Sequence, residues 1–149
     1  MITFQENTLT VEQYLYLREQ VGWKPLTKEQ AQKALDNSLY TLSCYMDGNL
    51  VGMGRMVGDG AVVCYIQDLI VSPDAQFCGI GSMMMEWLIG YTESIGIPGT
   101  TMMLDLMCAK GREPFYEKHG FIARPTKDLG PGMIQYLEID GRILINEEE

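Results

Sequence analysis

Hydrophobic positions change their spacing along the chain, and the change predicts where strands and helices lie. The run from Val62 to Val71 is long, mostly apolar and rich in β-branched residues, and Ser72 and Pro73 end it. From Ile80 to Tyr91, apolar residues recur at i, i+3, i+4, i+7, i+8 and i+11, which is the spacing of one helix face. A buried central strand is therefore expected to lead through a short loop into a long amphipathic helix.

The N-terminal part predicts a short strand and two helices. Residues Ile2 to Gln5 have the composition of a strand, and apolar residues from Val11 to Val21 fall near helical spacing. Thr10 and Gln13 are placed as the two members of a capping box at the start of the first helix. A second, more polar helix is expected to begin after Thr27.

A hairpin and three later elements complete the pattern. Strand-forming runs at Leu39–Met46 and Leu50–Val57 flank an Asp-Gly-Asn turn, which is typical of a β-hairpin. Beyond the long helix, the sequence predicts a strand within Thr100–Cys108, a short helix within Arg112–Gly120 that Gly120 closes, and a last strand at Met133–Ile139.

Composition indicates one globular domain spanning residues 1–149. Hydrophobic residues make up 46% of the chain and charged residues 21%, so a core of ordinary size can form. Twenty acidic against eleven basic side chains give a net charge of −9. This sign disfavours binding to a nucleic-acid backbone.

Cysteine and histidine usage gives no support for a metal site. The four cysteines form no CxxC pair, and His119 is the only histidine. The N-terminus has no basic region followed by an apolar run, and no window reaches the roughly 18 apolar residues that a membrane span needs. We therefore expect a cytoplasmic protein with reduced thiols, no metal and no membrane partner.

The segment Gln76–Ser82 carries the clearest candidate chemistry. It lies between the central strand and the long helix, where glycines let the backbone approach a ligand and free amides with the helix dipole attract an anion. Taken alone, such a segment is more often only a tight turn. A Rossmann fingerprint would need glycine at position 84, which holds Met84, and the Gly-Lys-Ser/Thr of a P-loop is absent.

Two blocks together make the chain resemble the GNAT superfamily of acyl-CoA-dependent N-acetyltransferases. The family signature Gln/Arg-x-x-Gly-x-Gly/Ala is met by Gln76, Gly79 and Gly81, directly after DLIVSPDA, and the later block PFYEKHGF contains Tyr116. The order of predicted elements also matches over essentially the whole chain. The resemblance implies an α+β fold: a mixed, mostly antiparallel sheet flanked by helices, whose fourth strand splays from the fifth.

The resemblance also implies acetyl-CoA as cosubstrate and no metal. The pantetheine arm would pair with the backbone near Leu69, Ile70 and Val71, and the amides from Cys78 to Ser82 would hold the pyrophosphate. The expected cofactor-binding residues are Leu69, Ile70, Val71, Gln76, Phe77, Cys78, Gly79, Ile80, Gly81 and Ser82. Backbone dipoles would then attract the anion, since no Lys or Arg lies between Pro73 and Ser82.

For catalysis, the resemblance implies direct attack of an amine on the thioester. Tyr116 matches the family tyrosine beside the leaving sulfur, and its alternative role is a core aromatic. Where some members have a glutamate as base, this chain has Tyr65. Asp68 is the nearest carboxylate and the candidate base, with Asp105 on the next strand; either could instead be structural or orient the substrate. His119 is expected at the surface or as a helix cap.

The leading interpretation is thus an N-acetyltransferase that acts on an amine of unknown identity, either a small molecule or a protein. The acidic balance favours a cationic acceptor. The alternative is a catalytically silent acyl-CoA-binding module with a regulatory or interaction role. The sequence leaves open whether the chain forms a homodimer.

Overall fold

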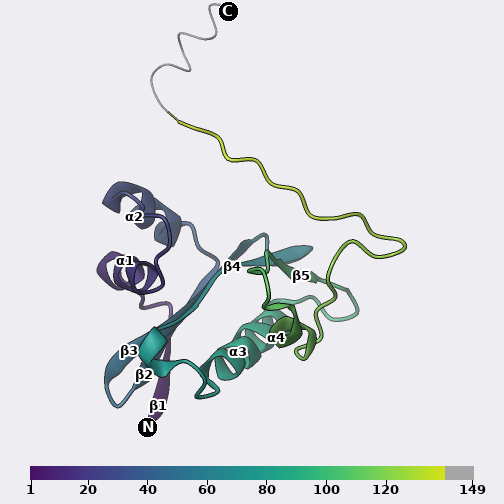
Figure 1. Cartoon of the computed structure of the whole chain (residues 1–149). Helices are drawn as coiled ribbons and strands as arrows, with labels where there is room; N and C mark the ends of the chain where they lie inside the picture. Colours follow the sequence, from purple (N-terminus) through teal and green to yellow (C-terminus); the bar gives the residue numbers. More distant parts are fainter. Residues whose placement is uncertain (140–149) are drawn as a thin grey trace, which may run out of the picture.

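The computed structural model describes residues 1–139, which form five strands, four α-helices and one 3-10 turn. Figure 1 shows their arrangement. The elements in chain order are β1 (Ile2–Glu6), α1 (Val11–Gln20), α2 (Lys28–Asp36), β2 (Tyr40–Met46), β3 (Asn49–Gly58), β4 (Val63–Val71), η1 (Pro73–Ala75), α3 (Ile80–Ile95), β5 (Met103–Leu106) and α4 (Glu113–Glu117).

The strands make one mixed sheet in the order β1-β2-β3-β4-β5. Neighbouring strands from β1 to β4 are antiparallel, whereas β5 runs parallel to β4 because α3 carries the chain across the sheet between them. Helices α1 and α2 cover one face, and α3 and α4 lie on the other (Figure 1). The predicted α+β class, the hairpin and the mostly antiparallel sheet are confirmed.

Each face of the sheet has its own core. Met84, Met85 and Leu88 on α3 are fully buried against the sheet, which accounts for the methionine-rich stretch of this helix. On the other face, Tyr14 and Leu17 of α1 pack with residues of β3 and β4. The capping box at Thr10 forms as the sequence predicts, so α1 begins at the expected residue.

A β-bulge in β4 moves its side chains from one core to the other. The pairing with β3 passes from Met56↔Ile66 to Arg55↔Asp68, so Gln67 is an extra residue without a partner on β3. Before the bulge, Ile66 belongs to the core under α3; after it, Ile70 belongs to the core under α1. The bulge therefore turns Asp68 toward α1.

The strand expected at Met133–Ile139 does not form, and that prediction was wrong. Within the described residues 1–139, these residues have no strand partner, and their large apolar side chains are exposed. A strand is stable only when an adjacent edge accepts its hydrogen bonds and a surface buries its apolar side chains. Figure 1 shows this part of the chain as an extended trace that leaves the helices and the sheet.

Among residues 1–139, no helix has the length and apolar character that crossing a bilayer requires.

Candidate active site

The sheet opens between β4 and β5. Their pairing begins at Val63↔Met103 and ends at Ile66↔Leu106, yet β4 continues to Val71. Within the described residues, the edge of β4 from Gln67 to Val71 therefore has no strand partner on the β5 side. An extended ligand can add to such an edge as a further strand. This edge contains Leu69, Ile70 and Val71, which the family resemblance assigned to ligand binding.

The loop after β4 presents free backbone amides at the start of α3. Gly79 is the N-cap residue with φ 79°, a left-handed conformation that suits glycine, and no side chain from the described part of the chain caps the helix. The first backbone N–H of α3 that forms a helical hydrogen bond is that of Met83, which donates to the Gly79 carbonyl at 3.1 Å. The amides of Ile80, Gly81 and Ser82 are thus available to an anion, and the helix dipole reinforces them.

Gln76 and Gly81 hold this loop against its neighbours. The side-chain amide of Gln76 donates to the Val71 carbonyl at 3.1 Å, which braces the loop on the end of β4. A Cβ on Gly81 would lie 3.4 Å from the Phe115 ring and 3.9 Å from Val71. Glycine at 81 therefore lets the start of α3 approach α4 closely. Phe77 adopts φ 67° with its side chain 99% exposed beside the amides.

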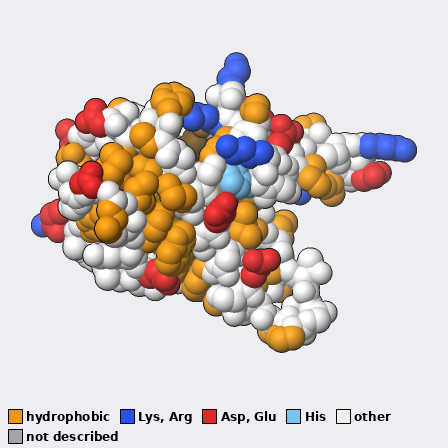
Figure 2. Space-filling model, turned by 90° about the horizontal axis from the view of Figure 1, so that it is seen from below, with side chains coloured by type: hydrophobic (Ala, Val, Ile, Leu, Met, Phe, Trp, Pro, Cys, Tyr) orange, Lys and Arg blue, Asp and Glu red, His pale blue; other side chains and the backbone are white. Residues whose placement is uncertain are grey.

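His119 lies closer to the loop than the sequence suggested. Its Nε2 is 3.2 Å from the Ser82 hydroxyl, and its ring is 5.1 Å from that of Phe115. The contact joins residues 37 positions apart, so no local pattern predicts it. Figure 2 shows basic side chains on one side of this single histidine and acidic side chains on the other.

Tyr116 on α4 is half-buried between two aromatic rings. Its ring meets Phe115 edge-on at 5.0 Å and Phe121 at 5.9 Å. Burial is the main cause that raises the pKa of the Tyr116 hydroxyl, and the nearby Cys108 raises it further. The positive charge of Arg112 offsets part of this increase. The phenol therefore stays protonated near neutral pH and is a hydrogen-bond donor.

An unpaired edge of β4, free amides at the start of α3 and a protonated tyrosine on α4 are the three features that the resemblance to the GNAT superfamily predicts. The model of the acetyltransferase (GNAT) domain matches residues 37–123, which is more than half of the chain. This chain belongs to the GNAT acetyltransferase family. The predicted family is therefore confirmed.

Similar proteins and structures agree with this assignment. Protein SA2161 from meticillin-resistant Staphylococcus aureus is 34% identical, with a TM-score of 0.78 over 91% of this chain and 100% of that one. The GNAT family protein SP0256 from Streptococcus pneumoniae TIGR4 is 31% identical, with a TM-score of 0.78 over 93% and 100%. The uncharacterized N-acetyltransferase ycf52 of Gracilaria tenuistipitata var. liui is 31% identical to this chain. The aligned region is 80% of this chain and 65% of that relative.

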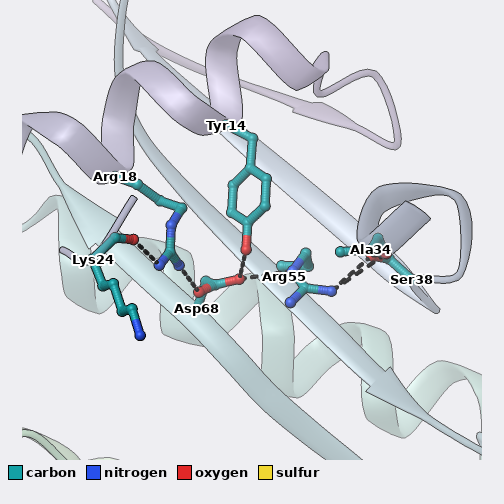
Figure 3. A network of polar contacts seen from close by, with 7 residues as sticks. All are labelled: Tyr14, Arg18, Lys24, Ala34, Ser38, Arg55 and Asp68. Carbon is teal, nitrogen blue, oxygen red and sulfur yellow. Dashed lines mark hydrogen bonds and ion pairs between the residues drawn. The ribbon is translucent and has the colours of Figure 1, made fainter. Parts of the chain in front are cut away.

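Asp68, the candidate base, lies in a buried ionic network (Figure 3). Its side chain is 1% exposed. Oδ2 accepts hydrogen bonds from the Tyr14 hydroxyl and from Arg55 Nε, each at 2.7 Å, and Oδ1 lies 3.4 Å from Arg18 Nη1. Burial and the Asp68 carboxylate raise the pKa of Tyr14, so this phenol remains a donor. Both carboxylate oxygens are therefore engaged.

The two arginines extend this network to the helices over the sheet. Arg18 donates to the Lys24 carbonyl at 2.9 Å and stacks over Trp23, with 5.2 Å from Cζ to the ring centroid. Arg55 lies 3.2 Å from the Ser38 hydroxyl at the end of α2. Asp68 thus fixes the loop between α1 and α2 relative to β4.

Asp105 on β5 offers the free carboxylate oxygen that Asp68 lacks. It pairs with Tyr65 next to the point where β4 and β5 separate, and Oδ1 is buried without a hydrogen-bond partner in the described part of the chain. Burial raises the pKa of the Asp105 carboxyl. The pKa of Tyr65 is raised mainly by burial and, as the second cause, by the negative charge of Asp105. Among residues 1–139, no three acidic, cysteine or histidine side chains converge as a metal site requires.

Asp105→Asn is expected to stabilise the fold at neutral pH by about 1 kcal/mol, because a buried charged oxygen without a partner is costly. Because burial raises the Asp105 pKa, the contribution of this group to wild-type stability is fully present below the unfolded-state pKa of about 3.9 and is lost as pH rises through the folded-state value. The gain should therefore vanish in acid. Urea unfolding at both pH values measures it, with exposed Asp128→Asn as control; a variant less stable at neutral pH would contradict the expectation.

Proposed function

We propose that this chain transfers an acetyl group from acetyl-CoA to an amine. The observation that carries the proposal is the end of the β4–β5 pairing at Ile66↔Leu106, beside the free amides that open α3. An extended pantetheine can add to the edge at Leu69–Val71 while its pyrophosphate reaches the amides at Ile80–Ser82. Family membership supports the same use of these two features.

The chemistry is direct attack of the amine nitrogen on the thioester carbonyl carbon. A backbone amide near Leu69 or Ile70 would donate to the oxyanion, a contact whose loss can cost about 3 kcal/mol. As the C–S bond breaks, Tyr116 donates a hydrogen bond to the sulfur. Complete proton transfer is unfavourable, since a phenol of pKa ~10 is a weaker acid than a thiol of pKa ~8.5 and burial raises the Tyr116 pKa further.

The attacking amine must also lose a proton. A primary ammonium of pKa ~10.4 costs roughly 4 to 5 kcal/mol to deprotonate at neutral pH without help. We assign the proton acceptor to Asp105, directly or through water, because its Oδ1 has no hydrogen-bond partner within residues 1–139 and burial raises the pKa of its carboxyl above the usual value. Asp68, whose oxygens bind Tyr14 and the two arginines, is assigned a positioning role instead.

Tyr116→Phe is expected to lower kcat by about tenfold to 100-fold, because one hydrogen bond to a charged sulfur is lost. The ring keeps its contacts with Phe115 and Phe121, so stability and acetyl-CoA affinity should change little. Steady-state kinetics with calorimetry separates the two quantities. Tyr40→Phe, which removes a buried hydroxyl elsewhere, is the matched control. Wild-type turnover in Tyr116→Phe would leave this tyrosine a packing residue.

The rival function is an acyl-CoA-binding module without turnover. Thiol release from acetyl-CoA, measured against a panel of polyamines, amino acids, aminoglycosides and peptides, separates the two. We expect at least one amine to stimulate release and to gain an acetyl group by mass spectrometry. Binding of acetyl-CoA without stimulation by any amine would favour the rival, and absence of binding would contradict both.

A further inference from the structure

A hollow of about 450 Å³ lies beside helix α3, and none of its lining residues belongs to the proposed acetyl-CoA site. Strand β1 contributes Glu6 to its wall and β2 contributes Tyr40, whereas the open edge belongs to β4. The remaining wall is one face of α3, with residues at helical spacing: Glu86, Trp87, Gly90, Tyr91 and Ser94. Gly90 leaves the hollow unfilled, because a Cβ at this position would meet nothing within 4 Å.

Aromatic rings form much of the wall and are held in place by their own contacts. Tyr91 stacks on Tyr40, with 3.9 Å between the ring centroids and 11° between the planes. Trp87, 39% exposed, packs on Phe4 with 5.2 Å between centroids. Rings that are fixed before a ligand arrives lose little freedom on binding. The face of such a ring attracts a cation.

The polar groups of the hollow also favour a cation. Glu6 and Glu86 are exposed carboxylates, and no Lys or Arg is among the described residues that line the hollow. Tyr40 is 1% exposed, and its Oη is buried without a hydrogen-bond partner within residues 1–139. Burial and, as the second cause, the negative charge of Glu6 raise the pKa of Tyr40. The phenol therefore stays neutral, and its oxygen can accept an N–H, which would remove the cost of an unpaired buried group.

We propose that the hollow is a binding site for an aliphatic ammonium group, supplied by a free amine or by a lysine side chain. The ring faces attract the positive charge, Glu6 and Glu86 balance it, and the Tyr40 oxygen accepts one of its N–H groups. The N–H donor distinguishes this ligand from a quaternary nitrogen. The open edge of β4 and the start of α3 take no part, so the site is additional to the proposed acetyl transfer and does not hold the acceptor nitrogen.

The fluorescence of Trp87 tests the site in the full chain. The chain has two tryptophans, so Trp23→Phe leaves Trp87 as the single reporter. Titration with butylamine, which stands for a free amine, or with Nα-acetyl-lysine amide, which stands for a lysine side chain, should give a saturable change in emission. The probe that binds more tightly identifies the source of the ammonium. Butanol and sodium chloride at matched concentrations should give no such change, and a lack of saturation with both amines would overturn the proposal.

Replacing Glu6 and Glu86 together by glutamine is expected to weaken binding by about tenfold, since each exposed carboxylate contributes a modest attraction. Circular dichroism checks that the fold persists. The matched control is Glu19→Gln with Glu29→Gln, which removes the same charge from exposed positions on α1 and α2, over the other face of the sheet. This control should bind as the Trp23→Phe chain does. Unchanged affinity in the first pair, or an equal loss in both pairs, would contradict the site.

Tyr40→Phe tests the contribution of the phenol oxygen. It keeps the ring that stacks on Tyr91 but removes the unpaired hydroxyl, so amine binding should weaken while stability persists. Full amine affinity in Tyr40→Phe would contradict the assigned hydrogen bond. None of these titrations contains acetyl-CoA or measures turnover, so failure of this site and failure of the proposed acetyl transfer are distinguishable.

Discussion

Replacing Asp68 by asparagine is expected to lower the free energy of unfolding by about 3 to 5 kcal/mol, the usual cost of removing one partner from a buried ion pair. The substitution keeps the side-chain volume but removes the negative charge that faces Arg18 and Arg55. It also gives Tyr14, a donor at 2.7 Å, a weaker acceptor. The two guanidinium groups would remain in a site that excludes water, with no opposite charge beside them.

Urea unfolding of Asp68→Asn measures this loss, with Asp74→Asn on the exposed turn η1 as the matched control. The position of the α1–α2 loop should change too, because Arg18 bonds Lys24 from the same network. A variant with wild-type stability and abolished turnover would restore Asp68 as the catalytic base and contradict the positioning role.

Gly81→Asp is expected to leave no measurable CoA binding. The new carboxylate would lie among the free amides of α3, where the CoA phosphate is expected to bind. Repulsion between these two negative charges costs several kcal/mol. The new Cβ would itself be in van der Waals contact with the Phe115 ring at 3.4 Å, so the carboxylate has little space on that side. Both effects act at the loop, so the remainder of the fold should persist.

Calorimetric titration with CoA tests this expectation on protein that circular dichroism shows to be folded. The matched control is Gly90→Asp, which adds the same side chain to α3 at a position where a Cβ meets nothing within 4 Å. This control should bind CoA as the wild type does. Unchanged CoA affinity in Gly81→Asp would contradict the assignment of the phosphate site to the start of α3.

Sequence patterns predicted those parts of the fold that local spacing determines. The period of apolar residues located α3, the pair Thr10 and Gln13 located the start of α1, and the Asp-Gly-Asn turn located the hairpin. The opening between β4 and β5 came from the family resemblance. The bulge at Gln67, next to the last residue of β4 that pairs with β5, has no distinct signal in the sequence, because a bulge is defined by the register of two strands.

Long-range contacts account for what the sequence left open. Asp68 meets Tyr14 across 54 positions and Arg18 across 50, so the choice between base and positioning group needed the tertiary structure. The contact of His119 with Ser82 has the same origin. The error at Met133–Ile139 is different: the strand-like composition was read correctly, but a strand also needs an edge to pair with.

Amide NMR spectra recorded during a titration with acetyl-CoA test most directly whether the cofactor occupies the proposed site. Binding there should shift the resonances of Gly79, Gly81 and Ser82, together with those of Leu69 to Val71 on the open edge of β4, and should leave Gly90 of α3 unchanged. Shifts confined to other residues, or none at saturating acetyl-CoA, would contradict the placement of the cofactor between β4 and β5.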